Sequence, residues 1–335
     1  MKHKKGPNRD MVASASGVSS ATVSRVYNNP GSVSAEKRNA VFKAAAKLGY
    51  IPNKSASALR RNGSGIITLL EIKKEKREYY WAELSLFKWF YADVLKAVKE
   101  VTDPSMFQLN LATAANAEDL GKLKGTTDGL ICFDVDRMEE AELIADSGLP
   151  FIIGHHTKNY TGFPRCSTDN EAGGVLQAEL LKKAGCTRPA YITAHLDAVE
   201  PHRDRLNGFL SAFGREQVTI IETGVGRDAG FKAAKGIISE LKSGRIDGIA
   251  AVNDITATGA GYALTDAGLK VQTDIPLAGY DNMPFGIALP FSLLSIDINP
   301  AGIYRSAAKM LLEELTGKAS QASRIISPFA ASNPF

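Results

Sequence analysis

The stretch of sequence that decides the fold of the N-terminal region is Gly17-Val18-Ser19-Ser20-Ala21-Thr22-Val23-Ser24-Arg25-Val26. Apolar residues recur at helical spacing on both sides of Gly17, which allows the backbone of a tight turn. Ser19 is placed to cap the second of these two helices. A third helix is expected from the cap Ser34 to a stop near Gly49. Three short helices predict a small helix-turn-helix headpiece.

The second helix of a helix-turn-helix presents its first residues to base edges in the major groove. Small hydroxyl side chains and the N–H groups at the helix start bind phosphates. These rules select six candidate DNA-binding residues, which are Ser19, Ser20, Ala21, Thr22, Ser24 and Arg25.

Charge is unevenly distributed along the chain. Residues 1–62 contain 12 lysines and arginines against only Asp10 and Glu36, a net charge of +10. The remaining residues contain 28 basic and 34 acidic side chains, a net charge of −6. A basic head on an acidic body is typical of a nucleic-acid-binding module attached to a domain with another role.

Residues 50–62 predict a short helix between two domains. Pro52 precedes an octet compatible with a helix, residues 54–61, and glycine and serine follow it. Leu59 is the one large apolar residue of the octet and stands among basic and small ones. Such a side chain suits insertion between base steps in the minor groove. We therefore expect Leu59 to contact DNA.

This pattern resembles the headpiece and hinge helix of the lactose-repressor/galactose-repressor (LacI/GalR) family. The resemblance extends beyond residues 17–26 to Asn28, to Val33-Ser34 and to residues 48–59. It implies that Ser20 and Ala21 choose operator bases, that Arg25 contacts a base or phosphate, and that Asn28, Asn53, Ala56 and Leu59 belong to the DNA-binding set. Two departures are Ser16, where the family usually has alanine, and Asp10, one position earlier than the usual aspartate.

From residue 66 onward, short apolar runs alternate with amphipathic segments, a pattern typical of parallel sheets covered by helices. Helical spacing is clear at Phe231, Ala234, Ile238 and Leu241. The expected fold class is therefore α/β, with an all-α headpiece and two doubly wound parallel-sheet lobes. Nine strands are expected, at Ile66–Leu70, Met106–Ala112, Gly129–Phe133, Pro150–Ile153, Pro189–Thr193, Val218–Glu222, Gly248–Val252, Pro276–Tyr280 and Ser292–Ile296.

The effector-binding core of the LacI/GalR family has this same periplasmic-binding-protein-like architecture. Resemblance to its motifs implies that Arg205, Asn253 and Asp281 contact a small-molecule effector, with Phe90 at the start of the first core helix. Arginine donates a fork, aspartate accepts from hydroxyls and asparagine does both, which suits a polyhydroxylated ligand. Each residue alone is more often a surface ion pair or a turn cap, and their joint placement at the C-terminal ends of strands is what favours the ligand role.

The effector region departs from the family pattern at two places. Lys88-Trp89 stands where the family commonly has Asn-Pro, and His155 stands where some sugar-binding members have aspartate. Trp89 could stack on a sugar face, although a large aromatic at helical spacing is more often a core residue. We include Trp89 and His155 among the candidate effector-binding residues.

Composition and motifs argue against several other classes. Hydrophobic residues at 44% and charged residues at 23% match an ordinary globular protein. The chain lacks an apolar run of the ~18 residues that a membrane helix needs and lacks an apolar signal-peptide core. Three cysteines without a C-x-x-C pair argue against disulfides and structural zinc. We expect a cytoplasmic protein with no membrane partner, no cofactor and no metal.

The sequence disfavours two rival functions. An enzyme is disfavoured because the chain lacks G-x-S-x-G, a P-loop and H-E-x-x-H, and adjacent His155 and His156 point to opposite sides of a strand and so make a poor metal site with Cys166. A transport-type sugar-binding protein is disfavoured by the basic headpiece and the missing signal peptide.

The sequence therefore predicts a transcriptional regulator that acts as a repressor and has no catalytic residues. The expected partners are a palindromic double-stranded DNA operator, a small effector of the carbohydrate class and a second copy of the chain. A cytoplasmic sugar-binding protein and a corepressor-dependent, purine-type repressor are the alternatives. The expected domains are a headpiece at 1–49, a hinge helix and linker at 50–62, and a core at 63–335. Within the core we expect a first lobe at 63–165 plus 295–320 and a second lobe at 166–294 plus 321–335.

Overall fold

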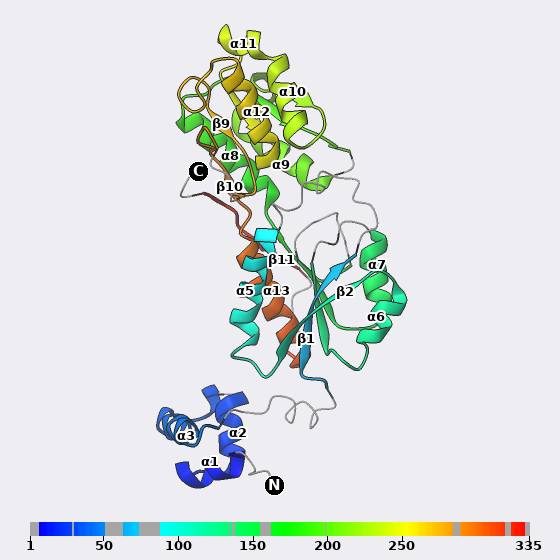
Figure 1. Ribbon diagram of the computed structural model, residues 1–335, viewed down its shortest axis with the longest axis vertical. Coiled ribbons are helices and arrows are strands. Elements are labelled where there is room, and N and C mark those ends of the chain that lie inside the picture. Colours follow the sequence, from blue (N-terminus) through cyan, green and yellow to red (C-terminus); the bar gives the residue numbers. More distant parts are fainter. Residues whose placement is uncertain are drawn as a thin grey trace.

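The computed structural model describes residues 7–28, 30–50, 63–73, 88–133, 135, 138–154, 162–197, 199–283, 289–318 and 323–331, with no side-chain description at positions 28, 30, 88 and 89. These residues form a helical headpiece and two α/β lobes (Figure 1). The observed fold class is the expected one, helices alone at the N-terminus followed by a core of parallel sheets.

The headpiece packs three helices around a small apolar core. The side chain of Asn8 caps α1 (Arg9–Ser16), and Gly17, with φ at 67°, ends it. Valines and alanines that recur at helical spacing face one another and exclude water. The other elements are α2 (Ser20–Asn28), the 3-10 turn η1 (Pro30–Ser32) and α3 (Ala35–Leu48). The core residues are Val12, Ala13, Val23, Val26, Val41, Ala44 and Ala45.

The first lobe is a six-stranded sheet with strand order β11-β5-β4-β3-β1-β2, in which every neighbouring pair is parallel. Its two central strands, Gly129–Phe133 and Phe151–Gly154, are apolar and buried along their whole length, since helices cover both faces of the sheet. The strands are β1 (Ile66–Ile72), β2 (Gln108–Ala114), β3 (Gly129–Phe133), β4 (Phe151–Gly154), β5 (Arg165–Thr168) and β11 (Ser323–Ile326). One face is covered by α5 (Lys88–Thr102) and α13 (Pro300–Leu315), the other by α6 (Ala117–Leu123) and α7 (Met138–Asp146).

The second lobe is a four-stranded parallel sheet with strand order β7-β6-β8-β9. The strands are β6 (Pro189–Thr193), β7 (Thr219–Glu222), β8 (Gly248–Ala251) and β9 (Leu277–Ala278). One face is covered by α8 (Asn170–Lys183) and α9 (Glu200–Phe213), the latter followed by η3 (Arg215–Gln217). The other is covered by α10 (Arg227–Gly236), α11 (Ile238–Lys242) and α12 (Asp254–Asp266).

Helices α8 and α9 approach each other through two glycines. A Cβ atom on Gly174 would overlap the carbonyl oxygen of Arg205, and one on Gly208 would overlap that of Glu171. The two backbones are therefore in direct contact, and this contact fixes the position of α9 on the sheet.

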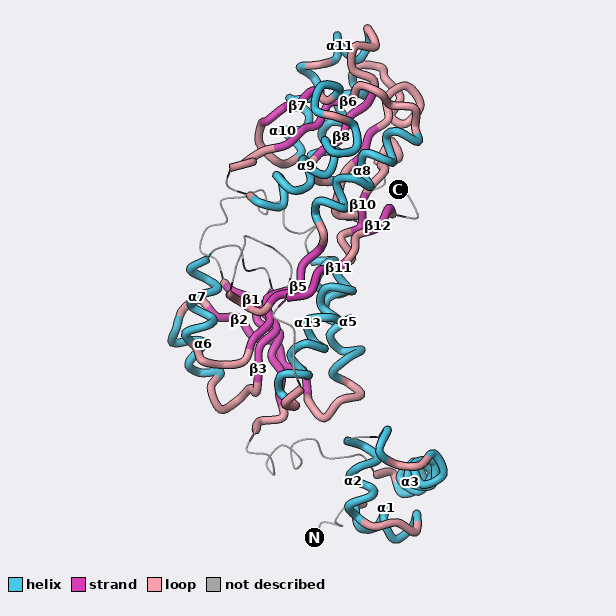
Figure 2. Tube along the Cα trace, turned by 180° about the vertical axis from the view of Figure 1, so that it is seen from behind, coloured by secondary structure: helices cyan, strands magenta, loops and turns pink. Residues whose placement is uncertain are grey.

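The chain passes between the lobes three times, and the last passage corrects one expectation. Strand β5 leads into α8, and β10 (Ile296–Asp297) leads back into α13. Strand β11 then pairs in parallel with β5 inside the first sheet, before β12 (Phe329–Ala330) pairs with β10. Figure 2 shows β5 and β11 side by side as they run toward the second lobe. Residues 323–326 therefore belong to the first lobe, not to the second as we expected, and the first sheet continues through Thr168 rather than ending at 165.

Each of the nine expected strands overlaps an observed one; β3 and β6 have the expected bounds, and the ends of the other seven are shifted. Strands β5, β11 and β12 were not expected. The expected single helical face from Phe231 to Leu241 is interrupted at Ile237, which separates α10 from α11 and whose φ of −114° and ψ of 14° are not helical. No helix among the described residues is long and apolar enough to cross a membrane.

Candidate functional site

The start of α2 carries most of the predicted DNA-binding residues. Ser19 accepts a hydrogen bond from the backbone N–H of Thr22 at 3.1 Å, so it caps the helix as its spacing predicts. Ala21 and Arg25 are exposed, and the side chains of Ser20, Thr22 and Ser24 are half-buried. Ser19 to Thr22 lie at the start of α2, the part of a recognition helix that meets base edges, whereas Ser24 lies in its middle and Arg25 in its last turn.

The hydroxyl of Ser20 is held by two neighbours from α1. Arg9 Nε donates to Ser20 Oγ at 2.7 Å, and Ser20 Oγ donates to Asp10 Oδ1 at 2.6 Å. A serine hydroxyl has one proton to donate, so this proton is already used by Asp10. Sequence reasoning noticed Asp10 only as a shifted family residue and did not identify Arg9.

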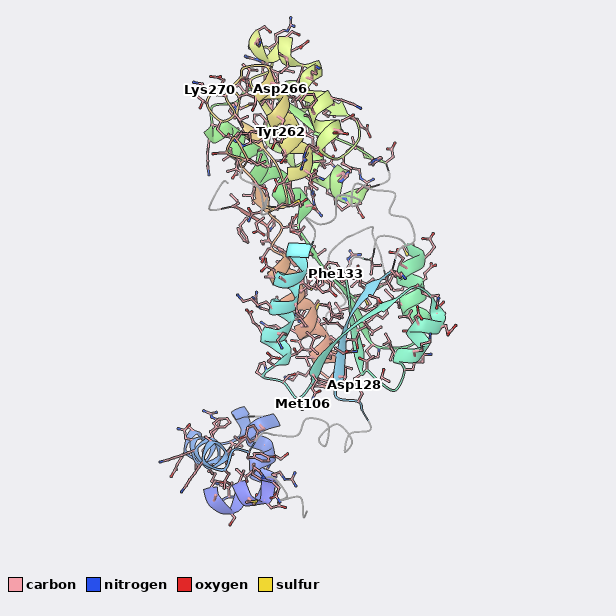
Figure 3. All side chains as sticks on the ribbon, in the orientation of Figure 1. Met106, Asp128, Phe133, Tyr262, Asp266 and Lys270 are labelled. Atoms are coloured by element: carbon pink, nitrogen blue, oxygen red, sulfur yellow. The ribbon has the colours of Figure 1, made fainter. Side chains whose placement is uncertain are left out.

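Other predicted DNA-binding residues have no described side chain. Asn28 is the last residue of α2, without side-chain description, and Asn53, Ala56 and Leu59 lie outside the described residues. Their roles stay predictions. The described chain resumes at Gly63, where Asp128 accepts hydrogen bonds from the backbone N–H groups of Ser64 (2.6 Å) and Gly65 (2.7 Å). Figure 3 shows Asp128 at the end of the first lobe where β1 begins.

A second polar cluster lies where the strands of the second lobe end, and Arg205 is at its centre. The side chain of Arg205 is 7% exposed. Its Nε donates to Asn170 Oδ1 at 3.0 Å, and its Nη1 donates to the carbonyl of Val252 at 2.8 Å. Its Nη2 lies 3.4 Å from Asp281 Oδ1, and its guanidinium stacks on the Tyr280 ring at 3.9 Å. Because β8 and β9 end at 251 and 278, loops after two strands converge on this arginine.

The cluster contains two acids in a poorly solvated environment. Burial raises the pKa of Asp281 to about 6, although the Arg205 guanidinium favours its ionised form. Burial, followed by the Asp281 carboxylate, raises the pKa of Asp254 well above its ordinary value. Asp281 also has a φ of 103°, a backbone conformation that costs a non-glycine residue energy and recurs at functional sites.

The Asn253 side chain has one polar atom with a hydrogen-bond partner and one without a partner among the described residues. Its Oδ1 accepts from the backbone N–H of Thr256 at 2.9 Å and so caps α12. Its Nδ2 is fully buried and donates to no described residue. The hydroxyl of Thr193, at the end of β6, is buried in the same way. Buried polar groups are normally satisfied, so these two atoms are candidates for hydrogen bonds to a ligand or water.

Sequence reasoning therefore identified Arg205, Asn253 and Asp281, which the structure brings to one edge of one sheet. It did not assign Asn170, Thr193 or Asp254 to the site. Asn170 comes shortly after β5, and Asp254 comes shortly after β8. Polar residues that follow the C-terminal ends of parallel strands often contact ligands, and this position in the sequence could have identified both.

The candidates in the first lobe behave differently. Phe90 is 2% exposed and packs in the core with the rings of Phe133 (5.7 Å) and Tyr304 (6.3 Å). Tyr91, which is half-buried, is more accessible. Figure 3 places Phe133 near the end of the first lobe closer to the second. Trp89 lies in α5 without a described side chain, and His155 lies outside the described residues.

Nothing in the described part of the chain is arranged as a metal site, since it contains no group of three or more His, Cys, Asp or Glu side chains able to hold an ion. Cys132, Cys166 and Cys186 are buried and free, and burial raises the pKa of each thiol.

Two family descriptions match the two functional regions. Residues 10–53 match "Bacterial regulatory proteins, lacI family", and residues 178–331 match "Periplasmic binding protein-like domain". The first match covers α1 to α3, and the second covers most of the second lobe together with the returning segment.

Curated relatives and solved structures are similar over nearly the whole chain. The HTH-type transcriptional regulator CelR of Thermobifida fusca is 26% identical, covering 97% of each chain. The HTH-type transcriptional repressor PurR of Aliivibrio fischeri (strain MJ11) is 26% identical, covering 92% of this chain and 91% of its own.

Two solved structures share the fold. A CelR–cellobiose complex has a TM-score of 0.63 at 24% identity, covering 97% of this chain and 98% of that one. A lac repressor dimer bound to operator and the anti-inducer ONPF has a TM-score of 0.61 at 23% identity, covering 98% of each chain. The chain therefore combines a region of the lacI family of bacterial regulatory proteins at 10–53 with a periplasmic binding protein-like domain at 178–331, and its full-length relatives are named as transcriptional regulators.

Proposed function

We propose that the chain is a transcriptional repressor, bound as a homodimer to a palindromic operator, whose DNA affinity is set by a small polyhydroxylated ligand. The observation that carries the ligand role is the cluster of buried Arg205 and Asn253 with the partly buried Asp281, in which the Asn253 amide donates to no described residue. A carboxylate that accepts and an amide that donates can bind the vicinal hydroxyls of a sugar.

The position of the cluster supports control of DNA binding. Asn170, a partner of Arg205, directly follows β5, and Asn282 donates to Asp297 of β10 at 2.9 Å. Both strands connect the lobes, so a ligand that contacts the cluster and the first lobe would favour one arrangement of the lobes over another. A ligand changes a second affinity only through such unequal binding to two conformations.

Relatives support a sugar as the first ligand class to test. One solved relative is a complex with cellobiose, and another is a dimer on operator DNA. A purine corepressor is the second candidate, supported by similarity to the repressor PurR.

The experiment is a thermal-shift screen of the full chain against sugars, sugar phosphates and purines, followed by operator binding with each ligand that raises the midpoint. The operator is first obtained by selection from randomised palindromic duplexes. Asn253→Ser keeps an oxygen that caps α12 but removes the buried amide, so we expect a several-fold loss of ligand affinity with little loss of stability. Ligand affinity unchanged in Asn253→Ser would place the effector elsewhere, and a chain that selects no operator would overturn the repressor function.

A further inference from the structure

We propose that Arg9 reads an operator base, and that Ser20 and Asp10 position its guanidinium. This inference rests on the proposed operator binding and adds a specificity-determining residue from outside the recognition helix. Arg9 is the first residue of α1, and its Nε donates to the hydroxyl of Ser20, the first residue of α2.

The first step of the argument is what the recognition helix itself can offer. Ala21 has no polar side-chain atom, so it can contribute only apolar contact, for example with a thymine methyl group. The Ser20 hydroxyl has one proton to donate, and it donates it to Asp10 Oδ1 at 2.6 Å. It therefore has no hydrogen to donate to the acceptors of guanine or adenine while that bond lasts. The start of α2 is poor in base-reading donors.

The second step is what Arg9 adds at the same place. Its Nε lies 2.7 Å from Ser20 Oγ, which holds the guanidinium beside the helix end that faces the major groove. Only Nε is engaged with a described residue, so among the described residues both Nη groups remain without an acceptor. A guanidinium presents two parallel N–H groups that match O6 and N7 of guanine.

The third step is how the position is maintained. Asp10 accepts the Ser20 proton, and this orients the oxygen lone pairs of Ser20 for the Nε–H of Arg9. Asp10 therefore acts on Arg9 through Ser20. Bases are distinguished by such fixed donors, whereas a freely moving cation would only add affinity for phosphates.

The test measures affinity ratios among operators with the full chain. Each protein is titrated against the selected operator and its single base-pair variants. The proteins are the wild type, Arg9→Ala, Arg9→Lys and Ser20→Ala. The control is Lys43→Ala, which removes an exposed cation on α3. For Arg9→Ala we expect the preference for one G·C pair in each half-site to fall by about 5- to 150-fold, with preferences at other positions retained. Arg9→Lys should retain affinity better than preference, and Ser20→Ala should lose part of the same preference.

The ratio between two operators for one protein sample does not depend on the folded fraction, so a destabilised headpiece cannot imitate this result. Equal weakening on every operator variant, with a shallower salt dependence, would mean that Arg9 contacts phosphate and would overturn the proposal. An unchanged base preference in Arg9→Ala would overturn it as well. A wild-type chain that selects no sequence would instead contradict the proposed function.

Discussion

At the scale of single residues, Arg205 has a structural role that the sequence did not indicate. A resemblance to effector-binding arginines predicts a residue directed at a ligand. In the structure its guanidinium already contacts Asn170, Val252, Tyr280 and Asp281. Removing Arg205 therefore leaves the Asp281 carboxylate without its cation, which should affect the stability of the fold as well as ligand binding.

Arg205→Ala should destabilise the core by about 1 to 3 kcal/mol, because it leaves the partly buried Asp281 without its cation and the oxygens of Asn170 and Val252 without a donor. The double variant Arg205→Ala with Asp281→Asn should recover part of this loss, since no unpaired carboxylate then remains. Urea denaturation of the four proteins of the cycle measures both effects. The exposed neighbour Arg203, whose side chain is 47% exposed, is the control, and Arg203→Ala should change stability by less than about 0.5 kcal/mol. Additive losses at 205 and 281 would contradict the pairing.

The raised pKa of Asp281 predicts a pH dependence with a defined sign. Its pKa is about 6 in the folded chain and near 3.8 when unfolded, so between these values the folded chain binds more protons. The corresponding stabilisation is complete below the lower value and is lost as the pH rises through about 6. Asp254, whose pKa is also raised, contributes with the same sign. The unfolding free energy of the wild type, measured from pH 4.5 to 7.5, should fall more steeply than that of Asp281→Asn, and parallel profiles would be the contrary result.

At the same scale, the sequence could identify residues by type and place but not by burial. Asn253 and Asp281 follow apolar strands, so their convergence could be predicted. Phe90 was expected at the site only from the family resemblance, and its ring is covered by Phe133 and Tyr304, because packing depends on which aromatics the other elements supply. Thr193 looks like an ordinary strand residue, and only its buried hydroxyl, which has no hydrogen-bond partner in the described part of the chain, distinguishes it.

At the scale of elements, the glycines between α8 and α9 connect packing to the candidate site, because α9 carries Arg205. Gly208→Ala should force α9 away from the carbonyl of Glu171, destabilising the core by about 1 to 3 kcal/mol and weakening ligand binding. Gly121→Ala in α6 is the matched control, since nothing lies within 4 Å of its added methyl group. It should be neutral or stabilising by up to about 1 kcal/mol. Thermal denaturation and ligand titration of both variants measure this, and equal behaviour would argue against the close helix contact.

Elements with strong periodicity could be predicted from the sequence, and short ones with mixed polarity could not. Strand β3 is continuously apolar and was expected with its observed bounds. Strand β11 contains serine and arginine beside two isoleucines. It pairs with β5, which lies far earlier in the chain: the paired residues Thr168 and Ile326 are 158 positions apart. Whether a strand joins a sheet so far away in sequence depends on how the chain passes between the lobes. The local sequence pattern carries no information about that path.

At the scale of the whole molecule, the division of charge predicts how DNA binding responds to salt. The N-terminal 62 residues carry a net charge of +10, and lysine and arginine contacts release condensed counterions from DNA. Operator affinity should therefore fall steeply as salt increases, with a linear dependence between the logarithms of affinity and salt concentration. A chain of residues 63–335 should lose operator binding and keep the ligand-induced rise in its melting midpoint. Operator binding by the shortened chain would contradict the assignment of DNA recognition to the headpiece.

The most direct test of the account is the operator affinity of the full chain with and without a saturating ligand found by thermal shift. We predict that the ligand changes this affinity by about 5- to 150-fold, which is the usual range of coupling between two sites on one protein. We also predict that the effect diminishes in Asn253→Ser at the same ligand concentration. An operator affinity that is identical with and without bound ligand would contradict the claim that the polar cluster of the second lobe controls the headpiece.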